Sequence, residues 1–244
     1  MALTPFELVF ETGSPVTLRR HALHLDGLLS ALCFRHTGCP EKALGMLKEL
    51  LLWNEHGFYH ASAMAFGVTP EQTITAQTRH SVGRMRHGTL LHESLLAPIK
   101  INRHGENVYR KVNINGGPER NRLNRWNACH APYLVFHGVG DVDHIGALTA
   151  FYCSRVGVNS NAGSGTVQGV YARAIDDDLS CIDGGGGVAR NLPVSWFNDN
   201  GINIPVARTR YLPVTAPYWS NHNACKAVEA VPVEKIRRVI FSDR

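Results

Sequence analysis

The sequence lacks the marks of membrane, secreted and zinc-binding proteins. The 244-residue chain has no run of about 18 apolar residues, so we expect no transmembrane helix. Its first segment, MALTPFELVFETG, has neither a basic stretch nor a long apolar one, so we expect no secretory signal. The six cysteines are scattered and form no C-x-x-C pair, which favours reduced thiols over zinc ligands or disulfides. We therefore expect a cytoplasmic protein that uses no membrane, metal or cofactor.

Charged residues are scarce and unevenly placed. They make up 18% of the chain, against 44% hydrophobic residues, a balance typical of a globular domain. Residues 79–125 contain ten Lys or Arg and three Glu, a local net charge of +7, whereas the whole chain carries +5. Eight of these ten cations are arginine, which suits bidentate phosphate contacts and stacking on bases.

Two interpretations of this basic segment stay open. Most charge runs are solvated surface faces that bind nothing. Here the local excess is larger than the charge of the whole chain, which favours a polyanion as partner.

Residues 140–176 form the clearest local pattern: a capped helix, a glycine-rich loop and a strand. Asp141 can cap the helix, and Asp143 adds negative charge near its positive end. We expect one apolar face on this helix, made by Val142, Ile145, Leu148, Phe151 and Tyr152. Gly157 is a plausible helix stop, the loop 158–165 is rich in turn-forming residues, and 166–175 alternates as a strand does. Glycines in such a loop can serve turn geometry alone or allow close approach of a ligand.

The remaining elements follow from periodicity and turn signals. We expect strands near residues 6–11, 58–66, 133–136 and 239–241. A helix capped by Asp26 and closed by Gly38 should precede a second helix that begins at Pro40. We find no internal repeat.

Two segments depart from this regular pattern. Residues 70–127 are polar and basic, and Ile99 to Ile101 can pair with Val108 to Val112, so we expect an insertion that forms a long protruding hairpin or loop pair. Residues 177–235 are rich in Asp, Gly and Pro, which predicts an irregular, extended tail. Three adjacent aspartates, 176–178, point in different directions and make a poor metal site.

Together the elements predict a single α+β domain over residues 1–244. The order β-α-α-β, insertion, β-α-β is typical of a ferredoxin-like, RRM-like sheet with helices on one face. Sheets of this kind carry RNA-recognition modules, although the fold alone does not decide the function.

Four short segments, in this order, resemble the repeat-associated RNA-binding (RAMP) superfamily of CRISPR effector subunits. They are Ser14-Pro15-Val16 with His24 to Leu29, Phe136 to Asp141, Ala162 to Val167, and Pro217-Tyr218-Trp219. The chain is most similar to the Cas-five type of subunit in type IV effector complexes. The likeness spans most of the chain and is thin between residues 60 and 125.

The resemblance implies a non-catalytic subunit of a ribonucleoprotein in antiviral defence. Such a subunit caps the 5′ handle of the guide crRNA, inserts a thumb-like hairpin into it and contacts backbone and large subunits. Target DNA and a helicase are then partners through the complex. This chain departs from the family in one respect, because Arg155 precedes a glycine loop that has no cation.

The resemblance and the charge pattern together predict the RNA-binding residues. Arginines should hold phosphates, backbone N–H groups of the glycine loop should approach the RNA, and aromatic rings, Tyr109 among them, should stack on bases. The predicted set is Arg79, Arg84, Arg86, Lys100, Arg103, Arg110, Lys111, Arg120, Arg122, Arg125, Trp126, Arg155, Gly163, Gly165, Tyr218 and Trp219. Tyr218 and Trp219 can equally pack within a proline-rich cap.

Two other functions remain as alternatives. A metal-independent endoribonuclease that processes CRISPR repeat RNA would need a general base, and His21, His24 and His130 are candidates. No catalytic residue is assigned, because no Ser-His-Asp set or paired-histidine motif occurs. A DNA-binding structural module is the third possibility.

Overall fold

The structure is a computed structural model that describes residues 3–17, 22–83, 98, 100–108, 120–231 and 237–239. The chain divides into two compact units. The first unit contains residues 1–77 and 128–244, and the second contains residues 78–127. The second unit overlaps the predicted insertion, residues 70–127.

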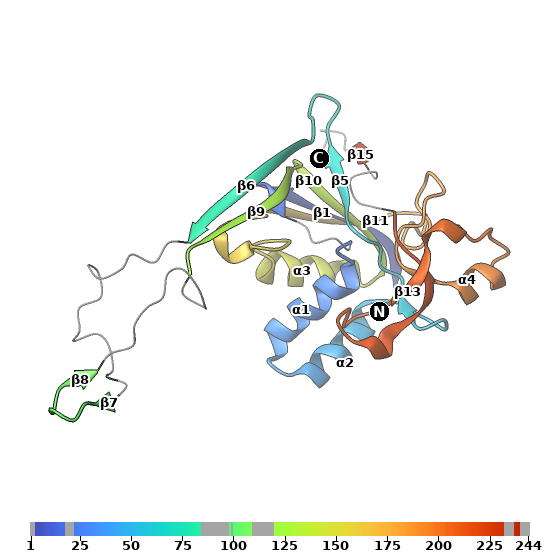
Figure 1. The fold of residues 1–244 in the computed structure, drawn as a ribbon. Helices are drawn as coiled ribbons and strands as arrows, with labels where there is room; N and C mark the ends of the chain where they lie inside the picture. The colour runs from blue at the N-terminus through green and yellow to red at the C-terminus, as the bar shows by residue number, and fades with distance from the viewer. Residues whose placement is uncertain are drawn as a thin grey trace. The chain divides into compact units, whose positions relative to one another are not determined.

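The described elements form a mixed α+β structure (Figure 1). In chain order they are β1 (Thr4–Thr12), β2 (Val16–Thr17), α1 (Leu25–Thr37), α2 (Pro40–Leu50), β3 (Trp53–Asn54), β4 (Phe58–Tyr59), β5 (Ala65–Val68), β6 (Thr75–Gly83), β7 (Lys100–Ile101), β8 (Asn107–Val108), β9 (Arg122–His130), β10 (Tyr133–Gly140), α3 (Val142–Tyr152), β11 (Val167–Ala174), β12 (Leu192–Pro193), α4 (Val194–Asp199), β13 (Thr209–Pro213), β14 (Ala224–Val228) and β15 (Arg237–Val239).

A five-stranded sheet forms the centre of the first unit, in the order β11-β1-β10-β5-β15. Strand β1 pairs antiparallel with β10 and β11, β10 pairs antiparallel with β5, and β15 runs parallel to β5. The side chains of β1 alternate, and Phe6, Leu8 and Phe10 are fully buried in the main core. This alternation is the pattern from which the strand was predicted.

Helices α1, α2 and α3 lie on one side of this sheet (Figure 1), where α1 packs against α2 and α3 and α3 packs against β11. Their ends follow the sequence signals closely. Gly38 ends α1 at a φ of 66°, Pro40 opens α2, and the carboxylate of Asp141 accepts from the backbone N–H of His144 at 3.1 Å. These three predictions are confirmed.

The start of α1 differs from the prediction. The N-cap residue is His24, without a side-chain cap bond, and Asp26 lies buried in the first turn instead of capping it. Its carboxylate accepts from the Tyr218 hydroxyl at 2.8 Å and lies 3.7 Å from Nη2 of Arg190. Asp26 therefore takes part in a buried polar network of the core and does not cap the helix.

Three further expectations need correction. The predicted strand over 58–66 is two short strands, β4 and β5, with an irregular segment between them. Helix α3 ends at Tyr152, before the predicted stop at Gly157. Phe151, expected on the buried face of that helix, is 80% exposed.

Residues 177–231, the described part of the segment expected to be an irregular tail, are largely folded. Strands β12, β14 and β13 pair in that order, and α4 packs against β12 and β14. A second core lies here, made by Phe58, Cys181, Val188, Leu192, Trp196, Phe197, Val214, Ala227 and Val228. Trp196, Phe197 and Val214 lie between the prolines of the stretch that was expected to be irregular, and they are part of this core.

The second unit contains strands with little buried surface. Lys100 to Ile101 pair with Asn107 to Val108, which confirms the pairing predicted there for the part that is described. Strands β6 and β9 carry the chain into and out of this unit, and every residue of β6 is exposed. In the ranges that the structure describes, no helix is long and apolar enough to cross a membrane.

Candidate nucleic-acid interface

Six of the predicted RNA-binding cations of the basic segment lie in the described part of the second unit. Arg79 lies on β6, Lys100 on β7 and Arg103 in the turn that follows β7. Arg120 precedes β9, and Arg122 and Arg125 lie on that strand. The other predicted residues of the segment, Arg84, Arg86, Arg110, Lys111 and the stacking candidate Tyr109, lie outside the described residues.

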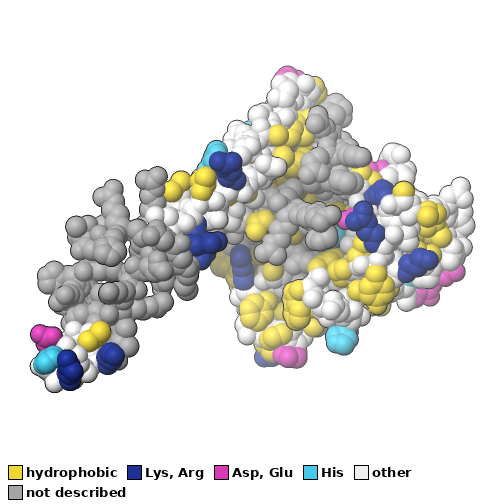
Figure 2. All heavy atoms as spheres, in the orientation of Figure 1, with side chains coloured by type: hydrophobic (Ala, Val, Ile, Leu, Met, Phe, Trp, Pro, Cys, Tyr) yellow, Lys and Arg dark blue, Asp and Glu magenta, His cyan; other side chains and the backbone are white. Residues whose placement is uncertain are grey.

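All six of these cations are exposed to solvent. Figure 2 shows Lys and Arg side chains on the surface of this unit, including its β7–β8 hairpin. In the described ranges of the unit, Glu106 is the acidic residue, and its carboxylate accepts from Nδ2 of Asn102 at 2.8 Å. Among described residues no carboxylate pairs with Arg79, Arg120 or Arg125. The described part of this surface therefore carries more basic than acidic side chains.

Strand β9 adds an aromatic ring to these cations. Trp126 is half-buried, and its alternation with Arg122 and Asn124 places the three side chains on one face of the strand. The indole Nε1 is enclosed and has no hydrogen-bond partner among the described residues. Because this nitrogen is shielded from solvent, a ligand would contact the remaining exposed part of the half-buried ring.

The glycine loop is tied to the N-terminal segment of its own unit. The hydroxyl of Ser164 donates to Pro15 O at 3.0 Å and accepts from the N–H of Thr17 at 3.1 Å. A Cβ on Gly165, whose φ is +64°, would overlap the carbonyl oxygen of Val156. Gly163, with φ +84°, has open space at its Cβ position. Of the two predicted glycines, only Gly163 faces a space that a ligand could enter.

Tyr218 and Trp219, predicted together, lie in different environments. The ring of Tyr218 stacks on His24 with 4.6 Å between centroids, and its hydroxyl donates to Asp26. Burial raises the pKa of Tyr218 well above its ordinary value. Trp219 is 86% exposed. These positions favour the packing role for Tyr218 and leave Trp219 accessible to a base.

The histidines considered for catalysis do not form a site. His24 is buried, and burial, with Arg190 nearby, holds its pKa well below the ordinary value. The ring Nδ1 of His130 is enclosed without a partner among the described residues, and His21 lies outside them. No described contact joins any two of the three.

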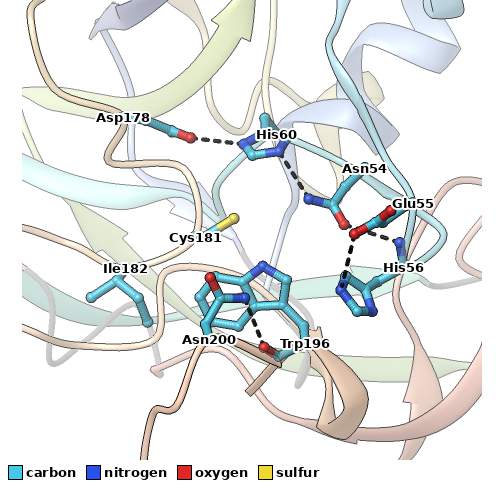
Figure 3. A pocket seen from close by; sticks show the side chains of 9 residues that line it. All are labelled: Asn54, Glu55, His56, His60, Asp178, Cys181, Ile182, Trp196 and Asn200. Carbon is cyan, nitrogen blue, oxygen red and sulfur yellow. Dashed lines mark hydrogen bonds and ion pairs between the residues drawn. The ribbon is translucent and has the colours of Figure 1, made fainter. Parts of the chain in front are cut away.

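A pocket of about 360 Å³ lies elsewhere in the first unit, between the β3–β4 hairpin, residues 178–182 and α4 (Figure 3). It was not predicted. Nδ1 of His60 lies 2.7 Å from the carboxylate of Asp178, and Nε2 lies 3.1 Å from the amide of Asn54. Nδ1 of His56 lies 3.2 Å from the Ser195 hydroxyl.

The His60–Asp178 pair is the main electrostatic feature of this pocket. Burial disfavours the imidazolium, but hydrogen bonds to Asp178 and Cys181 outweigh it and raise the pKa of His60 to about 9. The same bond, with those from Ser180, lowers the pKa of Asp178 although burial opposes this. These shifts favour an ion pair, whereas the Asn54 amide favours a neutral ring, because its Oδ1 accepts from the His56 N–H and its Nδ2 faces Nε2 of His60.

The rim of the pocket is acidic. The carboxylate of Asp199 lies 3.5 Å from Nε2 of His56, and that of Glu55 lies 4.0 Å from it. Both carboxylates are well exposed, so the pocket disfavours phosphate groups. No group of three or more His, Cys, Asp or Glu positioned to hold a metal occurs within the described ranges. The elements that build the pocket are distant in sequence, which is why no local motif indicates it.

Comparison of the sequence with protein-family models and with curated proteins finds no match in either set.

Proposed function

We propose that the chain is a non-catalytic RNA-binding subunit of a type IV CRISPR effector ribonucleoprotein. In this role it caps the 5′ handle of the guide crRNA and contacts the neighbouring backbone and large subunits. One observation carries the proposal: the six predicted RNA-binding cations that the structure describes in the second unit are all exposed to solvent. Exposed arginines on a surface are suited to phosphate contacts, which supply most of the sequence-independent affinity for nucleic acid.

The strand order supports the rest of the proposal. Counted along the chain, β1, β5, β10 and β11 are the first to fourth strands of a β-α-β-β-α-β unit, and they are ordered 4-1-3-2. The element order, with helices on one side, supports the ferredoxin-like arrangement that we propose. Modules with this sheet commonly recognise single-stranded RNA. The β6–β9 segment takes the place of the thumb-like insertion in the Cas-five type of subunit.

Charge reversal of three arginines tests the proposal. We expect Arg120→Glu, Arg122→Glu and Arg125→Glu together to weaken binding of a labelled repeat-derived RNA in a fluorescence anisotropy titration. Each lost phosphate contact should also lower the slope of log K against log salt by about 0.7. The matched control is Lys42→Glu, Lys48→Glu and Lys226→Glu, which reverses three exposed cations of the first unit.

The two variants change net charge equally, so a general electrostatic effect would weaken both alike. Unchanged affinity in the arginine variant would mean that these side chains form a solvated face, and the proposal would fail. Site-specific cleavage of the RNA by the wild-type protein without metal would instead support the endoribonuclease alternative. Equal retention of a DNA handle at high salt would favour the DNA-binding alternative.

A further inference from the structure

Two helices of the first unit end together at an exposed group of aromatic and basic side chains. Nη1 of Arg35, in the last turn of α1, donates to the carbonyl of Tyr152, the last residue of α3, at 2.9 Å. Nδ1 of His36 lies 3.0 Å from the Tyr152 hydroxyl, and the two rings meet edge to face at 5.6 Å. We call Arg35, His36, Phe151 and Tyr152 the helix-end patch.

Phe151 has no packing role that accounts for it. At about 100° per residue, Ile145, Leu148 and Tyr152 fall on one side of α3, and Phe151 falls about 120° away from Ile145. Its ring touches Tyr152, with 4.7 Å between centroids and an interplanar angle of 68°. The side chain remains 80% exposed, so a large apolar ring is held in water beside a second aromatic ring.

Two arginines, Arg35 and Arg155, donate to backbone carbonyls around the C-terminal end of α3. The guanidinium of Arg35 donates to the Tyr152 carbonyl, and that of Arg155, three residues after α3, donates to the Ser160 carbonyl at 2.7 Å. Among the described residues neither guanidinium pairs with a carboxylate. A guanidinium has five N–H donors, so one bond to a carbonyl anchors each side chain and leaves most donors available.

We propose that the helix-end patch, together with Arg155 just after α3, is a second RNA contact, in which a splayed base of the single-stranded guide stacks on Phe151 and flanking phosphates bind Arg35 and Arg155. The proposal rests on the proposed RNA-binding function and extends it to the first unit. An exposed ring beside Tyr152, whose carbonyl anchors Arg35, with Arg155 three residues further along the chain, matches the combination of stacking platform and cations in single-strand binders. A protein partner would require a wider apolar centre than one largely exposed ring offers.

Removal of the ring and of the charges tests the two parts of the contact. We expect Phe151→Ala to weaken binding of a labelled single-stranded repeat RNA by about fivefold or more, the effect of one lost stack. We expect Phe151→Trp to retain binding, because tryptophan also offers a stacking face. Arg35→Gln with Arg155→Gln should lower the salt slope by about 1.4, since two phosphate contacts are lost.

Tyr211→Ala is the matched control. Tyr211 is 75% exposed on β13 of the same unit, and Arg210, its neighbour in sequence, already lies 3.6 Å from the Glu229 carboxylate. Its removal should leave RNA affinity unchanged. Thermal unfolding of each variant should match the wild type, because Phe151 and Tyr211 are both on the surface. Ultraviolet cross-linking of the wild type to the RNA should attach it to Phe151 or Tyr152.

The outcomes separate this inference from the function on which it rests. If the wild type binds RNA and Phe151→Ala binds equally well, the patch is not an RNA contact and the proposed function stands. If the wild type does not bind RNA, both fail. If Phe151→Ala keeps RNA affinity and loses a copurifying subunit, the patch is a protein contact and the inference is overturned.

Discussion

Arginines serve different purposes in the two units of this chain. In the first unit several of them pair with carboxylates: Arg173 lies 2.8 Å from Glu7, Arg210 lies 3.6 Å from Glu229 and Arg238 lies 3.4 Å from Asp183. Arg35 and Arg155 of that unit are exceptions, since each donates to a carbonyl and has no carboxylate partner among the described residues. In the described part of the second unit, the one acidic residue is Glu106, and it bonds to an amide. Cations that stabilise a fold lie beside carboxylates, whereas cations that bind a polyanion have no carboxylate partner.

Arg190 is the fully buried example of an arginine that lies beside a carboxylate. It is fully buried, donates to the carbonyls of Tyr59, Ala61 and Val214, and lies 3.7 Å from Asp26 with its Cζ 4.8 Å from the centroid of the Phe58 ring. Arg190→Met should lower the free energy of unfolding by about 3–5 kcal/mol, because it leaves a buried carboxylate and several carbonyls unpaired. Urea denaturation measures the loss.

Arg210→Ala is its matched control, because the Arg210–Glu229 pair is exposed and such pairs contribute about 0–1 kcal/mol. A cost below about 1 kcal/mol for Arg190→Met would show that the buried arginine is not structural, and the contrast between the units would lose its clearest case.

The next largest loss of stability is expected for a substitution in the glycine loop. Gly165→Ala should cost about 2–4 kcal/mol, because φ is +64° and the new Cβ would overlap the Val156 carbonyl. Gly163→Ala should cost about 1 kcal/mol, because its positive φ is strained but its Cβ position is open. Chemical denaturation separates the two variants.

RNA affinity then decides what the loop does. If it is a close-approach platform, Gly163→Ala weakens RNA binding, since the added methyl faces open space where the RNA would lie. If it only joins α3 to β11, affinity stays at the wild-type value and Gly163 leaves the predicted set.

The sequence indicated the features that depend on near neighbours. Gly38, Pro40 and Asp141 each act within one helical turn, and alternation along β1 depends on one strand alone, so these ends and faces were predictable. The role of Asp26 was not, because its partners Arg190 and Tyr218 are far along the chain. A carboxylate at a helix start looks the same in sequence whether it caps the helix or enters the core.

The same limit explains the errors in α3 and in the C-terminal part. Phe151 fits a three- and four-residue spacing, but it lies outside the arc that Ile145 and Leu148 bury. Helix α4 is only six residues long and follows Pro193, so its periodicity is too short to detect. The pocket around His60 combines three distant segments, and no spacing rule connects them.

A pH titration tests whether the pair of His60 and Asp178 in the first unit stabilises the fold. Its ordinary pKa is 6.5 and its folded value is about 9, so the imidazolium stabilises the fold fully below pH 6.5. Between pH 6.5 and 9 the unfolded chain has lost the proton while the folded chain keeps it, so the free energy of unfolding should fall by about 1–3 kcal/mol and then level off.

The control is His60→Gln, in which this fall should disappear. The ¹⁵N shifts of the ring give a direct measurement, and both nitrogens should be protonated at pH 7. In the structure Nδ2 of Asn54 faces Nε2 and its Oδ1 accepts from the His56 N–H, so protonation of Nε2 requires the amide to turn and lose that bond. A neutral ring at pH 7 would mean that Asn54 donates to Nε2 and that the pair is not ionic.

The smallest effect on stability is expected for the exposed arginines of the second unit. Arg79→Gln, Arg103→Gln and Arg125→Gln should each change the free energy of unfolding by no more than about 0.5 kcal/mol, because each side chain is exposed and has no described carboxylate partner. Each should still weaken RNA binding and its salt dependence. Arg173→Gln is the converse control: it breaks the 2.8 Å pair with Glu7 and should leave RNA affinity unchanged. Loss of stability in the second unit without loss of RNA affinity would reverse the comparison, because the exposed arginines would then hold the fold and not the ligand.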